Sequence, residues 1–412
     1  MSRIEQIKSY SGQVLDNIFF RPMLTGKSAE ELGIKVLYNM PVPTTLHFWR
    51  REDDVLKKYT SGGWNGSKKA SKYQKTIKLS KVKAELGYGA DDYFSTVYEL
   101  VTGRSDVNLD DLSGTELEEA ETALFRASIA ESIRATMWYG DNERTNGTLA
   151  TFDGVIKRIL EDAGDIPIQT FGYIAGKGGS DWAEKVLKKL WDQAPEELKA
   201  MRSEGQLAFF VTSDVYNAYE EHLDNVAIEA AYLAKQNGRE GLYYRGIPLV
   251  DMQLTGYNLK VSNLPHSIAF LTDRRNIALA VNTNDFPGTE VRMWYNPDLM
   301  ENRQRAIFMA GCDYLLPELL SVAIGVPFET LKFDYDGTTV SVSCRLSYAE
   351  DWVKGLVFSA YDNNDCLVVD SEDLLIEGKS ASGEYEIENL VRSEIVVGFG
   401  SNTWFIVSID HE

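Results

Sequence analysis

The chain has 412 residues, of which 44% are hydrophobic and 25% are charged, and these proportions are ordinary for a globular protein. A chain of this length is too long to fold around a single hydrophobic core of ordinary size, so we expect two or three domains. The formal net charge of −20 argues against sequence-independent binding of nucleic acid by the whole surface, because neutralising phosphates takes clustered cations.

Membrane and secreted classes also lack support in the sequence. No apolar run approaches the roughly 20 residues that span a bilayer, and the first ten residues, MSRIEQIKSY, contain no apolar signal core. The three cysteines, Cys312, Cys344 and Cys366, cannot make a disulfide framework, and none lies in a CxxC pair. We therefore expect synthesis in a reducing cytoplasm.

Residues 1–60 predict an irregular arm. One short helical stretch, IEQIKSYSGQVLDNIFF, is followed by Pro22, Pro41 and Pro43, which break the pattern. Long structureless segments are uncommon inside a compact domain. We expect this arm to lie on another surface, such as that of a neighbouring chain.

Residues 61–100 predict an extended hairpin. Apolar residues alternate with lysines from residue 77 to residue 82, which is typical of a strand, and the chain is expected to turn near Gly87 and Gly89 and to return through residues 93–100. Such a hairpin carries little apolar surface of its own. It needs a partner, because a lone two-stranded hairpin is marginal in water.

Seven lysines gather in this hairpin of an otherwise acidic chain. They are Lys68, Lys69, Lys72, Lys75, Lys78, Lys81 and Lys83. One interpretation is a solvated hairpin whose lysines protect a strand edge; another is nucleic-acid binding, although only Trp64 and Tyr73 offer stacking aromatics nearby. We favour a third, a positive arm laid across the acidic surface of another copy, because arm and hairpin both lack cores.

Residues 113–139 predict a long helix. Ser113 and Glu116 have capping-box spacing, and acidic residues crowd the first turns as the helix dipole prefers. At about 1.5 Å per residue the helix is near 40 Å long. The face expected to pack steps by three and four residues and consists of Leu117, Ala120, Leu124, Ala127, Ala130, Ile133 and Met137.

Two aromatic residues, Trp138 and Tyr139, end this helix, and Gly140 opens the polar loop that follows. We expect a rigid scaffold for packing, with the aromatic tip buried at its end. Gly140 then lets the chain turn back.

The next part of the chain mixes helices and strands. The segment QLAFFV predicts a buried strand that leads through Thr212, Ser213 and Asp214 into a helix that these residues cap, and RQRAIFMAGCDYLL predicts a long strand. Two short helices are predicted by WAEKVLKKLW and PEELKAMR. Beyond residue 330, short strands at regular spacing predict a small β-sandwich, so we place a domain boundary there.

No catalytic constellation is evident. The sequence has no G-x-S-x-G elbow, its four histidines lack metal-ligand spacing, and adjacent carboxylates such as Asp110 and Asp111 point in different directions in a regular element. Cys312 lies in an apolar strand pattern, which favours a buried, inert thiol. We expect no enzymatic activity, no cofactor and no metal.

Taken in order, these elements resemble the major capsid proteins of tailed phages, which have the Hong Kong 97-type fold. The resemblance covers about residues 1–330. It rests on element order and on the segments LFRASIAESIRATMWYGDNERTNGTLATFDGVIKRI, QLAFFVTSDVYNAYEEHL, YYRGIPLVDM, FLTDRRNIALAVN and RAIFMAGCDYLLPELLSVA.

The resemblance implies an α+β fold with an added C-terminal immunoglobulin-like β-sandwich. Its expected parts are an N-terminal arm (1–60), an extended β-hairpin loop (61–100), a peripheral domain with the spine helix (101–164, completed by 291–330), an axial domain (165–290) and the sandwich (331–412). The lysines would reach over a neighbouring subunit. The expected axial loop, near the five-fold and six-fold axes, contains Gly176, Lys177, Gly178 and Gly179.

The function implied is that of a major capsid subunit, made in the host cytoplasm and built into the virion. Hexamers and pentamers would form an icosahedral shell that encloses DNA without sequence-specific binding and without a membrane. Scaffold, portal and decoration proteins are the expected partners. Because no long helical scaffolding segment precedes the arm, assembly would use a separate scaffold or an uncleaved arm, and no single lysine stands out for a covalent cross-link.

Two alternatives stay open. An encapsulin-like compartment shell would keep the fold and store protein cargo. A carbohydrate-binding or adhesive surface protein would act through the C-terminal sandwich, and predicts a secretion signal and an exposed aromatic patch.

Overall fold

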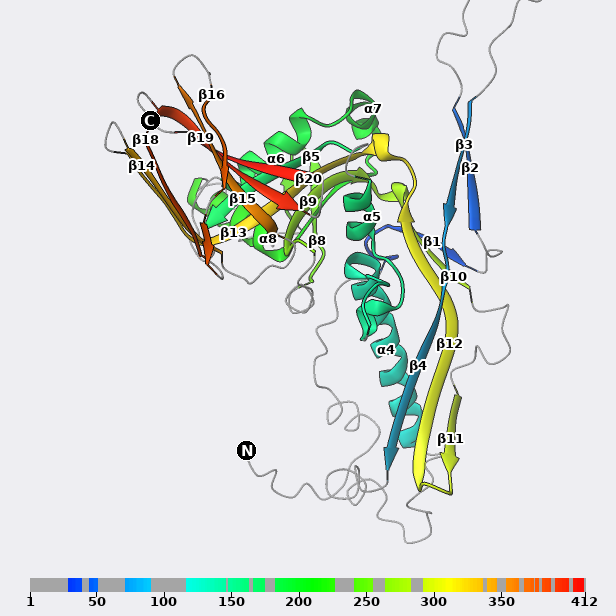
Figure 1. The fold of residues 1–412 in the computed structure, drawn as a ribbon. Coiled ribbons are helices and arrows are strands. Elements are labelled where there is room, and N and C mark those ends of the chain that lie inside the picture. Colours follow the sequence, from blue (N-terminus) through cyan, green and yellow to red (C-terminus); the bar gives the residue numbers. More distant parts are fainter. Residues whose placement is uncertain are drawn as a thin grey trace, which may run out of the picture.

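The computed structural model describes seventeen stretches of the chain. They are residues 29–38, 44–50, 71–89, 116–145, 147–162, 166–174, 182–226, 241–254, 264–282, 292–335, 339–346, 353–362, 367–373, 375–377, 380–386, 390–399 and 403–410. Helices and strands are both present, so the expected α+β character is confirmed. Figure 1 shows a long frame of helix and strands on one side and a broader body of helices and sheets on the other.

The frame combines a five-stranded sheet with a long helix, α4 (Glu116–Tyr139), which lies alongside the sheet (Figure 1). This helix confirms the long helix predicted over residues 113–139, and it is called the spine below. The longest strand of the sheet, β12, pairs with β10 and β11 on one edge and with β4 on the other. The strands, in order, are β1 (Lys35–Tyr38), β10 (Ile277–Asn282), β12 (Glu301–Tyr314) and β11 (Arg292–Asn296), with β4 (Ser80–Gly89) off this path.

Strand β12 carries the alternation that its sequence predicts. Ala306, Phe308 and Ala310 are buried, whereas the residues between them are half-buried. Gly311 allows a close crossing, because a Cβ atom there would lie 2.2 Å from the carbonyl oxygen of Lys78.

The broader body is built on a nine-stranded sheet. Helices α6 (Trp182–Asp192) and α8 (Ser213–Val226) cover one face of its central strands, and the end of α4 with α5 (Val155–Glu161) covers the other. The strand order is β17 (Leu375–Glu377), β18 (Ser380–Glu386), β14 (Thr339–Leu346), β13 (Leu320–Tyr335), β9 (Ser267–Asp273), β6 (Leu207–Val211), β8 (Ile247–Asp251) and β7 (Tyr243–Tyr244), with β5 (Ile168–Ile174) paired to β13.

Strands β6 and β9 are buried on both faces, which explains their continuous apolar sequences. Phe209 and Leu271 point into the core under α6 and α8, whereas Phe210 and Phe270 point into the core completed by α4. Among the described residues, the remaining helices are α7 (Glu196–Ala200) and four 3₁₀ turns (Thr148–Ala150, Met201–Glu204, Arg274–Asn276 and Pro317–Leu319).

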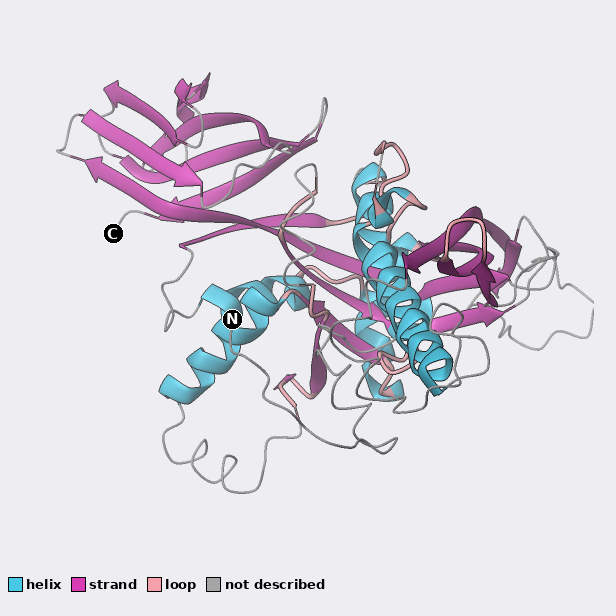
Figure 2. Ribbon diagram, turned by 90° about the horizontal axis from the view of Figure 1, so that it is seen from below, coloured by secondary structure: helices cyan, strands magenta, loops and turns pink. Residues whose placement is uncertain are grey.

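The C-terminal strands continue directly from this body. Strand β13 pairs with β9 and β5 in its first part and with β14 in its second, so the predicted boundary near residue 330 falls inside one strand. Figure 2 shows the C-terminal strands grouped at one end of the molecule, away from the helices. The second sheet here has the order β16 (Leu367–Asp373), β15 (Val353–Asp362), β19 (Leu390–Phe399) and β20 (Thr403–Asp410).

Strand pairing near the N-terminus differs from the expectation. The segment predicted as an irregular arm contains β1 and also β2 (Thr44–Arg50), which pairs with β3 (Ser71–Ile77) as a separate two-stranded ladder. The strand expected to turn near Gly87 and Gly89 is β4, which ends at Gly89 and pairs with β12. Residues 93–100 lie outside the described residues. Local sequence could not reveal these pairings, because the partners are distant along the chain.

Candidate functional site

The aromatic tip of α4 is fully buried, as predicted. The Trp138 ring lies 5.7 Å from the Phe210 ring and 5.8 Å from the Phe270 ring, centroid to centroid. The Tyr139 hydroxyl donates a hydrogen bond of 2.9 Å to the carbonyl oxygen of Pro265. The end of the spine is therefore anchored in the core beneath the nine-stranded sheet.

Gly140 sits where the chain turns away from the helix, which confirms the expected turn. Its N–H donates to Thr136, and its own carbonyl oxygen accepts from the N–H of Gly154, each at 2.8 Å. A Cβ atom at this position would lie 2.1 Å from the carbonyl oxygen of Phe152. Only glycine permits this approach of two backbone segments.

The predicted packing face of α4 is only partly covered. Met137 is fully buried and Leu124, Ala127 and Ile133 are half-buried, but Ala130 is exposed. Phe125 is buried although it lies outside the predicted stripe. Leu117 and Ala120 belong to the helix, but their side chains are not among those described.

The seven predicted lysines do not behave alike. Lys78, Lys81 and Lys83 are exposed, and Lys75 is half-buried. Lys72 lies on β3 without a described side chain, and Lys68 and Lys69 lie outside the described residues. The same is true of the predicted axial-loop residues Gly176, Lys177, Gly178 and Gly179.

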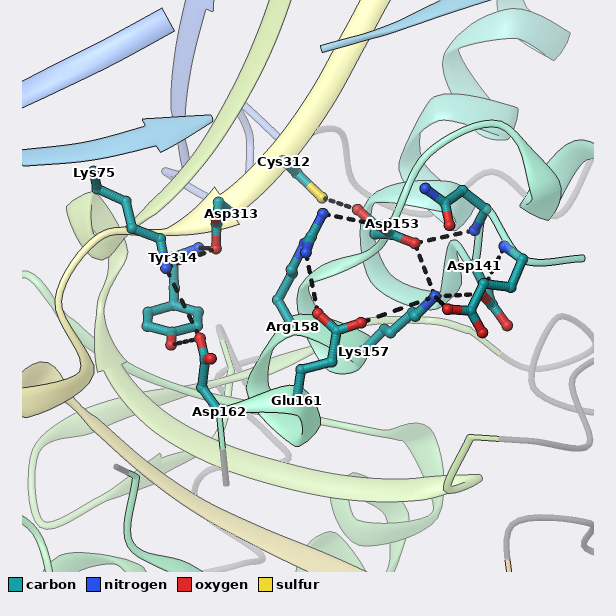
Figure 3. A network of polar contacts seen from close by, with 12 residues as sticks. Lys75, Asp141, Asp153, Lys157, Arg158, Glu161, Asp162, Cys312, Asp313 and Tyr314 are labelled. Atoms are coloured by element: carbon teal, nitrogen blue, oxygen red, sulfur yellow. Dashed lines mark hydrogen bonds and ion pairs between the residues drawn. The ribbon is translucent and has the colours of Figure 1, made fainter. Parts of the chain in front are cut away.

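Lys75 lies on β3, near the end of the β2–β3 ladder that contacts the frame. This end is called the root of the ladder, and Lys75 attaches it to the frame (Figure 3). Its Nζ atom lies 3.6 Å from Oδ1 of Asp313, 3.9 Å from Oδ2 of Asp162 and 4.4 Å from the centroid of the Tyr314 ring. The Tyr314 hydroxyl donates a hydrogen bond to Asp162. Two residues further along β3, the fully buried Ile77 packs in a small apolar cluster with Ala278, Ala280 and Leu315.

Lys157 stands at the centre of the same polar network (Figure 3). Its Nζ atom lies 2.6 Å from Oδ1 of Asp141 and 3.1 Å from Oδ1 of Asp153, so α5 is tied to the loop that follows α4. Arg158 adds contacts of 2.8 Å to Asp153 and 3.0 Å to Glu161. Burial lowers the pKa of Lys157, but the hydrogen bonds and charges of the two aspartates outweigh it, and the pKa is raised.

Two groups of β12 complete the network. Burial raises the pKa of the Asp313 carboxyl, and the charges of Lys75 and Arg158 oppose that effect. The Cys312 thiol donates to the carbonyl oxygens of Met137 and Asp153, at 3.3 and 3.2 Å, and burial raises its pKa. The predicted burial of this thiol is confirmed, and its raised pKa disfavours the thiolate, which is the reactive form.

A second buried ion pair links the spine to the segment after β8. Arg134 contacts Glu131 at 2.6 and 2.9 Å, and it donates to the carbonyl oxygens of Met252 and Gln253 at 2.7 and 3.2 Å. Both side chains are less than one-tenth exposed.

Sequence reasoning missed the polar network. The one available signal was Asp313, an isolated carboxylate within the apolar strand pattern RQRAIFMAGCDYLL. The contacts of Lys75, Lys157 and Cys312 each join one structural element to another. Among the described residues, no group of three or more His, Cys, Asp or Glu side chains is placed to hold a metal ion, and no helix is long and apolar enough to cross a membrane.

Sequence comparisons find no matching protein-family model and no matching curated protein. Among solved structures, the chain is similar to one in the asymmetric unit of the bacteriophage PhiM1 mature capsid, with a TM-score of 0.42, 9% identity, and coverage of 73% of this chain and 88% of that one. It is also similar to a chain of the satellite phage P4 procapsid that includes the size determination protein, with a TM-score of 0.46, 8% identity, and coverage of 76% of this chain and 96% of that one. A third similar chain is in the capsid of Myoviridae phage XM1, with a TM-score of 0.43, 13% identity, and coverage of 72% of this chain and 91% of that one.

Proposed function

We propose that this chain is the major capsid subunit of a tailed phage, with a Hong Kong 97-type fold, and that it assembles into an icosahedral shell around the genome. One observation carries the proposal. A rigid frame of α4, β4 and β12 bears the β2–β3 ladder, which has no further strand partner among the described residues. Because a two-stranded ladder is marginal alone, a neighbouring subunit supplies the surface on which it rests.

The order of the elements supports this function. After β1 come the ladder and β4, then the spine helix, then the α/β body, and the β11–β12 hairpin closes the frame beside the spine. In this proposal, residues 101–164 and 291–330 form the peripheral domain and residues 165–290 the axial domain. The glycine-rich segment at residues 176–179 then meets its copies near the symmetry axes.

The strand order of the C-terminal sheets supports an added immunoglobulin-like domain. Lettered A to G along the chain, with C′ after C, the strands β13, β14, β18 and β17 form the sheet A-B-E-D, and β16, β15, β19 and β20 form the sheet C′-C-F-G. That partition is the one found in immunoglobulin sandwiches. We place this domain on the outer surface of the shell.

The expected assembly consists of hexamers and pentamers that enclose DNA without sequence-specific contacts. A net charge of −20 suits this role, because a container of like charge repels the packaged DNA. Scaffold, portal and decoration proteins are the proposed partners, and the virion is the proposed location. No catalytic role is proposed.

Assembly of the full chain tests the function. We expect size-exclusion chromatography and negative-stain electron microscopy to show closed shells, or pentamers and hexamers, for the chain expressed alone or with a scaffold. A strictly monomeric species under every condition would contradict the proposal.

Charge-reversal variants connect assembly to the exposed lysines of β4. Lys81→Glu with Lys83→Glu should reduce shell yield severalfold, because in this proposal these exposed cations contact the acidic surface of a neighbouring subunit. Lys188→Glu with Lys189→Glu, exposed on α6, is the charge-matched control and should assemble normally. Circular dichroism and urea unfolding verify that both variants fold. Equal yields from the two variants would show that the exposed lysines of β4 take no part in assembly.

A further inference from the structure

A groove of about 340 Å³ lies between α4 and β4. Buried apolar side chains, Val82, Phe125 and Phe308, form part of its lining. The helix contributes small hydroxyl groups, among them Ser128 and Ser132. Both sides of the groove therefore belong to the frame.

The rim of the groove is also apolar. Leu86 on β4 is 50% exposed, and Ile129 and Ile133 on α4 are half-buried. Apolar residues that gather around a groove in this way mark a site where another segment packs.

The position of Ala29, the first described residue, points to that segment. Ala29 packs against the same core cluster that Ile129 and Ile133 border, and Leu32 and Ile34 are members of this cluster. Twenty-eight residues precede Ala29, and an extended chain of that length spans up to about 90 Å. Residues 1–28 can therefore reach the groove from the point at which the described chain begins.

The sequence of residues 1–28 is chemically suited to the groove. Four of its apolar residues repeat at helical spacing and so share one face: Ile4, Ile7, Val14 and Ile18. The segment carries four Lys and Arg residues and two Asp and Glu residues. The first turns of α4 carry the opposite charge, in Glu116, Glu118, Glu119 and Glu121.

We infer that residues 1–28 dock in the groove between α4 and β4 of their own chain, with the apolar face of Ile4, Ile7, Val14 and Ile18 against Leu86 and Ile129. The docked segment covers the exposed side of the spine in the unassembled subunit. This inference does not depend on the capsid function, because it concerns a single chain.

Engineered disulfides test the docking in the full chain. Cys366 is replaced by Ser, while Cys312 and Cys344 are buried and kept. Val14→Cys is combined with Ser128→Cys in the groove, or with Leu86→Cys on its rim in case the first pair disturbs folding. The matched control combines Val14→Cys with Ser203→Cys, an exposed serine on the α/β body.

After oxidation of the dilute, unassembled subunit, we expect an intramolecular disulfide for one or both groove pairs, at least tenfold more abundant than for the Ser203 pair. Non-reducing electrophoresis and peptide mass spectrometry identify it. Disulfide-linked dimers as the main product would overturn the inference, because the segment would then belong to a second copy. Equal yields for groove and control pairs would also overturn it.

Hydrogen exchange supplies an independent readout. Ile7→Asp with Ile18→Asp should expose the groove and accelerate amide exchange in β4, while exchange in the core strand β6 stays unchanged. Unaltered exchange in β4 would contradict the docking.

Discussion

The ammonium of Lys75 lies 4.4 Å from the centroid of the Tyr314 ring, so a lysine of the two-stranded ladder makes a cation–π contact with the last residue of β12. Asp313, the preceding residue, places a carboxylate 3.6 Å from the same ammonium. The root of the ladder is thus held by charge and by an aromatic face at one point of the frame. Its stability should depend on the charge state of Asp313.

Replacing Lys75 by Met removes the charge and keeps most of the side-chain length. Lys75 lowers the pKa of Asp313, which burial raises, so the pKa should rise further in Lys75→Met. At pH 7 the variant should lose about 1–2 kcal/mol, because a partly buried carboxylate loses its cation. Carboxyl-carbon NMR and urea unfolding measure the two effects.

The dependence on pH follows from the direction of the shift. A carboxyl with a raised pKa in the folded state stabilises the fold most below that pKa, and this contribution falls as pH rises from the ordinary carboxyl value through the raised one. The deficit of Lys75→Met should therefore shrink as pH is lowered from 7 and Asp313 takes up a proton. Lys78→Met, which alters an exposed lysine, is the control. A deficit that is constant with pH would show that Asp313 is not the partner.

The buried pair of Arg134 and Glu131 should show strong coupling. Arg134→Met leaves the Glu131 carboxylate buried without its partner and should cost about 3–5 kcal/mol. Combining Arg134→Met with Glu131→Met removes the unpaired buried carboxylate, so the double variant should be more stable than Arg134→Met alone. Urea unfolding of the full double-mutant cycle measures the coupling. Additive losses would refute it.

Gly140 should tolerate no side chain. The Cβ atom of Gly140→Ala would lie 2.1 Å from the carbonyl oxygen of Phe152, so backbone must move, at a cost of about 3 kcal/mol or more. Gly87→Ala on β4 is the matched control, because its Cβ atom meets nothing nearer than 3.8 Å. We expect that control to stay within about 0.5 kcal/mol of the parent in thermal unfolding. Equal effects would argue against the close approach.

Cys312 should resist alkylation in the folded protein. Burial raises the pKa of its thiol, and the side chain is enclosed between α4 and β12. Iodoacetamide at pH 8 should modify it only after denaturation, as read by peptide mass spectrometry. Ser343→Cys, on the exposed side of β14, provides a reactive thiol for comparison. Modification of Cys312 at the rate of that thiol would contradict the burial.

The sequence by itself determined the elements whose signal is local. Helical spacing predicted the spine over residues 113–139, and it is described as Glu116–Tyr139; the apolar pattern of RQRAIFMAGCDYLL likewise predicted β12. The buried tip at Trp138 and the turn at Gly140 were also predictable. Helical periodicity and the exclusion of side chains at a tight turn both act over a few residues, so neighbours in sequence reveal them.

Tertiary structure alone decided which distant segments meet. Seven lysines look equivalent in the sequence, but the position of β3 turns Lys75 towards Asp313, next to the buried Ile77, and leaves Lys81 exposed on β4. The pairing of β3 with β2, and the passage of β13 through residue 330 into the C-terminal sheet, were equally hidden. Hydrogen bonds between strands, and charges buried between elements, join residues far apart in the chain, so their free energy depends on partners that local sequence does not specify.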